Sequence, residues 1–427
     1  MTARAFLDEL FRIAIEAAHP SACLRAHLPP PPAKGRLILL AAGKAAGSMT
    51  EVAERHYLDA GFPAARLTGL AVTRHGYGRP TKQIEVVEAG HPVPDAAGLA
   101  AAQHTLELAD SATADDVVLV LMSGGASANW IAPADGLTFA DKQAVTRALL
   151  RSGANIGEMN TLRKHLSRIK GGRLAKRAQP ARVITLSISD VPGDDPAVIG
   201  SGPTVPDPST LADAREIVAK YKLALPDAVA RALNDPANES PKPGDAAFAN
   251  TEYKLIARPA DAFRAAEVAV RKAGYEPVML GDRVEGEARE VAAQQAEYAL
   301  SLQRNGRKAV ILSGGELTVT IRGQGRGGPN QEYALALAAA LNGAPGIAAQ
   351  AGDTDGTDGG GGSATDPAGA VIDPTTLARA RALGLDPAAF LANNDSTGFF
   401  SKLGDLVETG PTCTNVNDFR AIVVDRL

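Results

Sequence analysis

One glycine-rich segment combines residues that could bind phosphate. Residues 321–333 read IRGQGRGGPNQEY, and the glycines at 323, 325 and 328 match the G-x-G-x-x-G dinucleotide fingerprint. The same loop holds Arg326, whose planar guanidinium suits phosphate oxygens and can stabilise a phosphoryl group in transfer. NAD pyrophosphate is normally held by backbone N–H groups without such a side chain. The loop therefore favours phosphoryl transfer, with a dinucleotide site as the alternative.

Two loops nearer the N-terminus offer a further cation and a flexible backbone. Lys44 lies in AAGKAAG directly after the apolar run LILL, where a lysine and helix N–H groups can approach phosphate. SGGASANW at 123–130 follows another apolar run, and its glycines can form an anion nest. The alternatives are a solvated lysine and a plain tight turn. No Walker pattern occurs, which argues against a P-loop NTPase. The residues predicted to bind phosphate or nucleotide are Ser123, Gly124, Gly125, Ser127, Gly325, Gly327 and Gly328.

Acidic residues gather in two more loops. SDVPGDDP at 189–196 and GDTDGTDG at 352–359 each follow an apolar run. Mg²⁺ takes one or two carboxylates and leaves its other positions to phosphate and water, so either turn suits it. The alternative is that aspartate only forms the turns. An EF-hand is excluded because the later Glu and the flanking helices are missing. The predicted metal ligands are Asp190, Asp195, Asp353 and Glu316.

The segment MNTLRKHLSRIKGGRLAKR at 159–177 predicts a basic helix. Lys164 and Arg168 would share one face of it at i, i+4. A charge run is usually a solvated face. Here no acid lies within the segment although the whole chain has a net charge of −4, so the cations indicate an anionic ligand.

Each of these loops follows an apolar run and precedes a helical pattern. Apolar strands that alternate with helices predict a parallel sheet covered on both faces, with ligands at the carboxyl ends of its strands. A chain of 427 residues exceeds a single core, and the Pro-, Asn- and Asp-rich stretch 234–250 is typical of a linker. We therefore predict an α/β fold with two domains, 1–240 and 241–427. Each would have a mainly parallel sheet flanked by helices, the first Rossmann-like, with the active site in the cleft between them.

Composition narrows the class of partner. The chain is 45% hydrophobic and 22% charged, as in soluble globular proteins. Its net negative charge and 4% aromatic content argue against nucleic acid. Cys23 and Cys413 are too few for a metal cluster and fit thiols in a reducing compartment. No window approaches the ~18 apolar residues of a membrane span, and no signal peptide is evident. We expect a cytoplasmic protein that acts on small molecules, and a homodimer is left open.

Taken together, these segments resemble the type II glycerate kinases, the glycerate 2-kinases that carry a C-terminal MOFRL domain. The resemblance runs nearly from end to end, and the stretch 187–209 is its most specific part. Some sequences of this kind have been labelled hydroxypyruvate reductases. The segments that carry the resemblance are AAGKAAG (41–47), LMSGGASA (121–128), NTLRKHLSRIKGGRLA (160–175), SISDVPGDDPAVIGSGPTVPDPS (187–209), LSGGELTV (312–319), GRGGPNQE (325–332) and GDTDGTDG (352–359).

The resemblance implies phosphorylation of D-glycerate at its 2-hydroxyl, with ATP as co-substrate and a divalent metal. The family's active-site lysine falls on Lys44. Many members have an arginine directly before the Asn-Gln-Glu triplet, where this chain has Pro329; Arg326 is the nearest arginine and could replace it. An NAD(P)H-dependent hydroxypyruvate reductase is the alternative.

The expected mechanism assigns a role to each loop. Lys44 and Arg326 would surround the transferred phosphate, while Asp190 would hold Mg²⁺ together with Asp195 or Asp353. An aspartate, Asp190 foremost, could also accept the proton of the 2-hydroxyl. The groups expected to bind glycerate are Lys164 or Arg168 for its carboxylate and Asn330, Gln331 and Glu332 for its hydroxyls.

Overall fold

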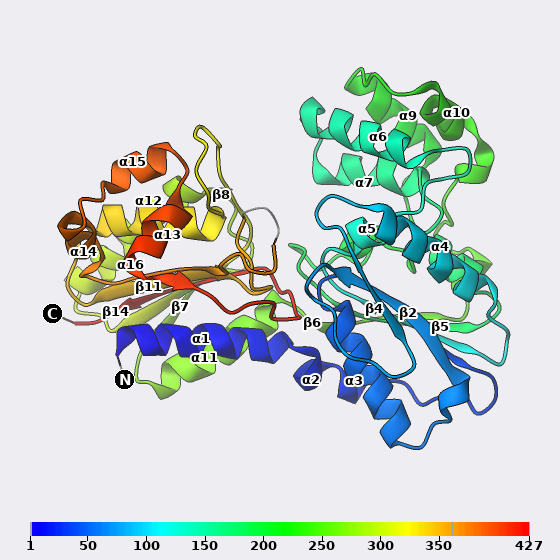
Figure 1. The fold of residues 1–427 in the computed structure, drawn as a ribbon, viewed down its shortest axis with the longest axis horizontal. Coiled ribbons are helices and arrows are strands. Elements are labelled where there is room, and N and C mark those ends of the chain that lie inside the picture. The colour runs from blue at the N-terminus through cyan, green and yellow to red at the C-terminus, as the bar shows by residue number, and fades with distance from the viewer. Residues whose placement is uncertain (1, 360–362, 427) are drawn as a thin grey trace. The chain divides into compact units, whose positions relative to one another are not determined.

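The computed structural model describes residues 2–359 and 363–426 (Figure 1). The chain divides into two compact units. The N-terminal unit is Cys23–Ile256, and the C-terminal unit combines Met1–Ala22 with Ala257–Leu427. Each unit contains one six-stranded sheet. No helix among the described residues is long and apolar enough to cross a membrane.

These units differ from the predicted domains 1–240 and 241–427 at both ends of the N-terminal unit. The linker-like stretch 234–250 forms short 3₁₀ turns at Pro236–Asn238 and Ala246–Phe248 and leads into strand β6 (Thr251–Ala257) of the first sheet. Turn-forming composition therefore marked loops within the N-terminal unit.

The N-terminal unit is built on a sheet with the strand order β3-β2-β1-β4-β5-β6. Strand β1 pairs in parallel with β2 and β4, and the pairs β2–β3 and β4–β5 are also parallel. This is the strand order of the Rossmann fold, so the predicted Rossmann-like parallel sheet is confirmed. The strands are β1 (Leu37–Ala42), β2 (Leu67–Arg74), β3 (Glu85–Ala89), β4 (Val117–Met122), β5 (Arg182–Ile188) and β6 (Thr251–Ala257).

The two central strands are apolar and buried along their whole length. β1 reads LILLAA and β4 reads VVLVLM, and every residue of both is buried. Alternate side chains such as Ile38 and Val120 pack with Leu106 of α4, while α3 contacts β1, β2 and β4. The helices of this unit are α3 (Ala46–Asp59), α4 (Ala96–Asp110), α5 (Ala126–Asn129), α6 (Phe139–Ser152), α7 (Ile156–His165), α8 (Arg173–Arg177), α9 (Leu211–Lys220) and α10 (Asp227–Asn234), while the short helix α2 (Pro20–Cys23) spans the boundary and has only Cys23 in this unit.

The sheet of the C-terminal unit has the order β13-β12-β11-β14-β9-β7 and is mostly antiparallel. Only β7 and β9 pair in parallel, whereas β14 enters antiparallel between β11 and β9. The prediction of a mainly parallel sheet is wrong for this unit, because a continuous apolar run signals burial and not direction. The strands are β7 (Glu276–Gly281), β9 (Ala309–Gly314), β11 (Ile347–Asp353), β12 (Gly369–Ile372), β13 (Leu406–Val407) and β14 (Asp418–Val424), with β8 (Gly286–Glu287) and β10 (Leu317–Thr318) forming a separate pair.

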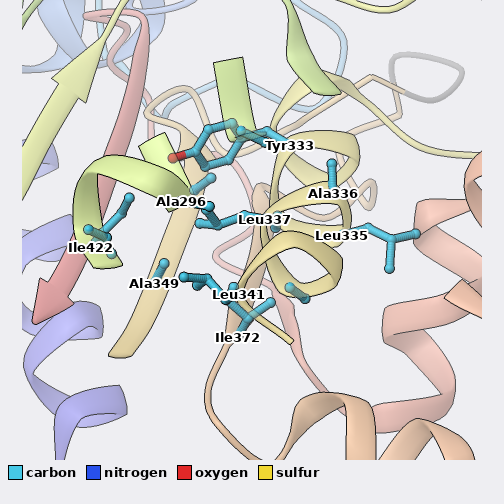
Figure 2. Packing of buried hydrophobic residues seen from close by; sticks show 14 of the residues in the cluster. Ala296, Tyr333, Leu335, Ala336, Leu337, Leu341, Ala349, Ile372 and Ile422 are labelled. Atoms are coloured by element: carbon cyan, nitrogen blue, oxygen red, sulfur yellow. The ribbon is translucent and has the colours of Figure 1, made fainter. Parts of the chain in front are cut away.

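Helix α13 (Pro329–Leu341) lies at the centre of this unit's hydrophobic core. Leu341 lies beside Ala349 of β11 and Ile372 of β12, and Leu335 points to the opposite side of the helix (Figure 2). Every residue from Tyr333 to Ala338 is apolar and buried, as in a helix that is covered on all sides. The other helices are α1 (Ala3–Ala18), α11 (Pro259–Lys272), α12 (Ala288–Arg304), α14 (Thr376–Ala382), α15 (Pro387–Ala392) and α16 (Ser396–Leu403).

Helix α1 belongs to the C-terminal unit because its apolar face packs there. Phe6 stacks on Tyr275 with ring centroids 5.5 Å apart, and Phe11 lies against Phe419 at 6.2 Å. Thr2 caps the helix by accepting the N–H of Ala5. The first helix is thus part of a core whose other elements begin at residue 257.

We expect Phe11→Ala to destabilise the C-terminal unit by about 3–5 kcal/mol, since Phe11 is buried and its ring would leave a cavity. The only tryptophan, Trp130, is buried in the N-terminal unit and reports that unit alone. Urea unfolding followed by circular dichroism should shift to lower urea, while the Trp130 fluorescence transition stays in place.

The matched control is Arg12→Ala, which removes an exposed side chain that pairs with Glu16 on the same helix. It should cost only a few tenths of a kcal/mol (~0.2–0.5). Equal effects of the two substitutions, or a shift in the Trp130 transition with Phe11→Ala, would contradict this packing of α1.

Candidate functional site

The loops after β1 and β4 meet at the carboxyl edge of the N-terminal sheet. This is the point where the strand order reverses, and sheets of this kind bind ligands there. The backbone N–H of Lys44 donates to the carbonyl of Gly124 (2.8 Å), and the N–H of Ala45 donates to Ser123 Oγ (2.9 Å). Gly43 has a φ of 116°, and a Cβ there would collide with Ser123. The two loops are therefore held together as one unit of structure.

Lys44 lies over the glycine turn that follows β4. Gly125 has a φ of 86°, and a Cβ there would lie 3.3 Å from Lys44 Cγ and 3.0 Å from the ring of His91. The structure thus brings Lys44 together with Ser123, Gly124 and Gly125, which were predicted from separate segments of the sequence. Ser123 itself is fully buried and its hydroxyl accepts the Ala45 N–H, so its role here is to position the Lys44 loop.

The segment after β5 reaches the same edge of the sheet. Ser127 Oγ lies 3.0 Å from Ser201 Oγ, and Lys170 Nζ donates to both the carbonyl and the hydroxyl of Ser127 at 2.6 Å. Ser201 has a φ of 62° between two glycines that also have positive φ. A left-handed non-glycine residue costs about 1–3 kcal/mol, and such residues cluster at functional sites.

The acidic turn after β5 contains a carboxylate oxygen that lacks a partner. Asp190 lies two residues after the end of β5 and is half-buried, whereas Asp195 is exposed and accepts the N–H of Ala197 (2.9 Å). Between them, Asp194 has a φ of 57°, and its Oδ1 is buried without a hydrogen-bond partner among the described residues. A buried oxygen of this kind can be satisfied by a cation, so the turn fits a divalent metal.

The predicted metal ligands fall in different units. Asp353 ends β11 and Glu316 follows β9, so both lie in the C-terminal unit, where Asp353 accepts the N–H of Asp355 and Glu316 is exposed. Within 2–359 and 363–426, no group of three or more His, Cys, Asp or Glu side chains is arranged to hold a metal ion. Any metal bound by the described residues would therefore take at most two ligands from His, Cys, Asp or Glu side chains at one place.

The predicted basic helix at 159–177 is wrong as a single element. Helix α7 ends at His165 and α8 begins at Arg173, with Gly171 and Gly172 both at positive φ between them. Because glycine readily adopts that conformation, the chain turns there. Lys164 and Arg168 consequently share no helical face.

Both predicted carboxylate-binding cations have partners within the N-terminal unit. Lys164 is buried and forms an ion pair with Asp207 (3.3 Å), a partner far along the chain that its local sequence does not reveal. Arg168 donates to the carbonyl of Pro133 (2.9 Å) and to Gln103 (2.8 Å). The geometry favours positioning roles for both over binding of an anion.

Sequence reasoning missed Lys142, which lines a small cavity beside the glycine turn together with Arg163 and Lys170 of the predicted basic segment. The cavity measures about 260 Å³ and lies between the glycine turn and helices α6 and α7. Lys142 is on α6, an ordinary amphipathic helix that gave no signal of a site. The polar residues of its wall include His91, Ser127, Lys142, Arg163 and Lys170.

The G-x-G-x-x-G loop of the C-terminal unit packs against its own chain. The N–H of Gly325 donates to the carbonyl of Asn393 (2.8 Å). A Cβ on Gly325 would collide with Asp395, one on Gly327 with Ser396, and one on Gly328 with Asp358. The loop follows the two-residue strand β10 of a separate pair, not a strand of the main sheet. The motif therefore lacks the strand-to-helix context of a dinucleotide fingerprint.

Arg326 presents its side chain to solvent from a fixed backbone. Its N–H donates to Asp395 Oδ1 (3.1 Å), and its carbonyl accepts the N–H of Thr397 (2.9 Å). The side chain is exposed, and its guanidinium forms no ion pair with any described residue. An exposed guanidinium on a backbone held by hydrogen bonds is suited to binding a ligand.

The polar triplet after this loop is buried in a hydrogen-bond network. Asn330 donates to Asp418 (2.7 Å), Gln331 accepts from Thr397 (2.7 Å), and Glu332 accepts from Arg289 (2.6 Å). The exposed fractions of Asn330, Gln331 and Glu332 are 1%, 0% and 2%. Buried side chains with these partners stabilise the C-terminal unit, so the geometry does not favour their predicted role on substrate hydroxyls.

Asp358 organises the start of helix α13. Its Oδ1 accepts the backbone N–H of Asn330 (3.0 Å), and its Oδ2 accepts that of Gln331 (2.8 Å). Burial raises the pKa of Asp358 to about 7, assisted by the neighbouring Asp418, while these hydrogen bonds act against the rise. The last aspartate of the acidic loop 352–359 therefore accepts hydrogen bonds from the N-terminus of helix α13.

We expect Asp358→Ala to lower the free energy of unfolding of the C-terminal unit by about 2–4 kcal/mol, because two buried helix N–H groups lose their acceptor. Chemical denaturation followed by circular dichroism measures it. Asp386→Ala is the control, since Asp386 also accepts a backbone N–H at a helix start, that of Ala388 in α15, but is exposed. An unshifted transition combined with a raised KM would instead place Asp358 at a substrate.

Two family models match the chain. Residues 6–234 match a domain of unknown function, DUF4147, and residues 309–418 match the MOFRL family. Together these two regions contain the N-terminal glycine turn, Lys44 and the glycine loop with Arg326.

Named relatives match over nearly the whole chain. A protein of Agrobacterium vitis, named provisionally a hydroxypyruvate reductase, is 48% identical over 99% of this chain and 95% of its own length. The D-glycerate 2-kinase of Thermotoga maritima is 39% identical over 96% of this chain and 95% of its own length. The glycerate 2-kinase of Pyrococcus horikoshii is 37% identical over 92% and 88%.

A solved structure agrees with these relatives. The crystal structure of glycerate kinase from Thermotoga maritima aligns with a TM-score of 0.85 and 38% identity, over 98% of this chain and 99% of that one.

Proposed function

This chain belongs to the MOFRL-containing glycerate kinase family, and from that premise we propose that it transfers the γ-phosphoryl group of ATP to D-glycerate. The 2-hydroxyl is the proposed acceptor, because the Thermotoga and Pyrococcus relatives are named glycerate 2-kinases. The observation that carries the proposal is the placement of Lys44 at the carboxyl edge of β1, against the glycine turn after β4.

Lys44 is suited to a phosphoryl group by its surroundings. It begins the turn into helix α3, whose N-terminal N–H groups favour negative charge. Gly125 leaves room for backbone to approach a ligand next to the lysine. Phosphoryl transfer requires positioning and charge neutralisation more than covalent chemistry, and this edge of the sheet offers both.

A reductase is the competing function, since the 48% identical relative carries that name. Dinucleotide binding at a Rossmann-type sheet uses a glycine fingerprint after β1 and an acid about 20 residues on. Here the segment around the end of β1, residues 41–48, contains only two glycines. The residue at the end of β2, where the acid would be expected, is Arg74. These features support the kinase over the reductase.

In the proposed reaction, Lys44 neutralises charge on the transferred phosphoryl group, and Arg326 is proposed as a second cation that binds phosphate. Asp190 accepts the proton of the acceptor hydroxyl as the oxygen–phosphorus bond forms and ADP leaves. Asp190 with Asp195 would hold Mg²⁺, and the partnerless oxygen of Asp194 supports the turn after β5 as a cation-binding segment. Bound Mg²⁺ would supply charge neutralisation at the phosphates. The substrates are small molecules, and we propose a cytoplasmic location.

A direct assay separates the two functions. The protein is incubated with D-glycerate, Mg²⁺ and ATP, and ADP release is followed; a parallel sample receives hydroxypyruvate and NADH. We expect ADP in the first and no loss of NADH absorbance in the second. Coupling the product to enolase identifies 2-phosphoglycerate by its conversion to an enol phosphate. NADH oxidation without ADP release would contradict the proposed kinase activity and favour the reductase.

We expect Lys44→Ala to lower kcat by about 10²–10³ without moving the thermal midpoint, because it removes a cation that acts on the transition state and packs little. Steady-state kinetics and a melting curve measure the two effects. Lys82→Ala is the control, an exposed lysine of the same unit. Turnover close to that of the wild type would remove Lys44 from the mechanism.

For Arg326→Lys we expect kcat/KM to fall about tenfold or more, because lysine keeps the charge and loses the planar fork that binds two phosphate oxygens. Arg322→Lys, an exposed arginine of the same loop, should change little. Equal activity of the two variants would leave Arg326 as a surface group.

A further inference from the structure

The cavity beside the glycine turn brings together cations from three segments of the N-terminal unit. Lys142 comes from α6, Arg163 from α7, and Lys170 from the turn before α8. The opposite wall contains Gly125 and Ser127, and apolar residues including Ile131 and Val145 complete it. The wall is therefore apolar with a few convergent polar groups, as small-molecule sites generally are.

These cations have no acidic partner among the described residues. Lys142 donates only to the carbonyl of Arg163 (3.4 Å), and Lys170 donates only to Ser127. The Arg163 guanidinium forms no ion pair within the described ranges. By contrast, the adjacent Lys164 is neutralised by Asp207. The cavity thus concentrates positive charge that the protein does not itself compensate.

Burial makes that arrangement costly. Lys142 and Lys170 are 5% and 3% exposed. Burial and the nearby Arg163 and Arg173 lower the pKa of Lys142 to about 7, and burial with Lys142 and Arg163 lowers the pKa of Lys170 as well. Uncompensated buried cations reduce stability, and apolar replacements of similar size would relieve that cost. A ligand anion would compensate them instead.

We propose that this cavity binds the carboxylate of the small hydroxy-acid substrate, with Lys142, Arg163 and Lys170 as its specificity-determining residues. The assignment rests on the proposed function, and it replaces the role predicted for Lys164 or Arg168. It names residues on α6 and α7 that lie outside the glycine turn and the acidic loops.

The size of the cavity favours the acid over the nucleotide. About 260 Å³ is below the ~300–1,000 Å³ that drug-sized ligands occupy, and it suits a molecule of three carbons. The cavity also opens beside the reacting group proposed above, because Gly125 lines it and also lies against Lys44 Cγ. An acid held by its carboxylate in the cavity would have its hydroxyl near Lys44.

The test substitutes Lys142→Met, which removes the charge at similar volume, and compares it with Arg147→Met, an exposed residue of the same helix. We expect the KM for D-glycerate to rise at least tenfold in the first variant only, with the KM for ATP unchanged. Calorimetric titration with D-glycerate in the absence of ATP should show weakened binding in the same variant. Glycerol, which lacks the carboxylate, should be an equally poor competitor of D-glycerate in the wild type and in the variant.

The outcomes separate this proposal from the kinase itself. If the wild type binds D-glycerate but releases no ADP, the proposed function fails while the cavity stands. If Lys142→Met and Arg147→Met bind D-glycerate equally well, the cavity proposal fails whatever the activity. A raised KM for ATP with an unchanged KM for D-glycerate would assign the cavity to a phosphate and overturn it.

A stability measurement guards against simple misfolding. The folded protein holds the Lys142 proton only below about pH 7, whereas the unfolded chain holds it up to about 10.5, so the stability penalty is largest at and below pH 7 and shrinks as pH rises towards 10. The charged groups that face this lysine are Arg163, Lys170 and Arg173, and His91 lines the same cavity. We therefore expect Lys142→Met to unfold at higher urea than the wild type at pH 7, with the difference decreasing by pH 9. Lower stability at pH 7 would show that Lys142 is a structural cation and contradict the proposal.

Discussion

The N-terminal unit depends on the junction between the loops after β1 and β4. Two hydrogen bonds, from the N–H groups of Lys44 and Ala45 to Gly124 and Ser123, fix the lysine loop against the glycine turn. Glycine at 43 makes that approach sterically feasible. Ser127, Lys170 and the segment after β5 are then attached to the far side of the same turn. A change in this junction would move the proposed phosphate and carboxylate groups together.

The first sheet could be predicted from sequence because β1 and β4 are uninterrupted apolar runs followed by glycine turns, a pattern that few other structures produce. Strand direction in the second sheet could not, since β14 and β11 look alike as apolar segments whichever way they run. The G-x-G-x-x-G match was misleading for a related reason. Glycine is required at 323, 325 and 328 by close contact with Asn393, Asp395 and Asp358, which the local sequence does not contain.

In the candidate site, the sequence likewise did not show which charged side chains have partners. Local sequence revealed that Lys164 and Lys170 lie in a basic segment, but not that Asp207 neutralises the first while the second lines a cavity. Lys142 carried no signal because a single lysine on an amphipathic helix is usually solvated. Pro329, by contrast, is explained by the fold. It is the first residue of α13, where a missing N–H costs nothing, and Asp358 accepts the two N–H groups that follow.

The position of β14 between β11 and β9 has a consequence for synthesis on the ribosome. β14 follows every other strand of its sheet along the chain, yet it occupies the interior, so this sheet stays divided until β14 has emerged. Helix α1 is made before the rest of its unit, and its apolar face is covered in stages: Phe6 packs against Tyr275, whereas Phe11 packs against Phe419 of β14 and stays uncovered until that last strand is made. The N-terminal unit, Cys23–Ile256, is made completely before that point, so it can fold while the second sheet is still divided.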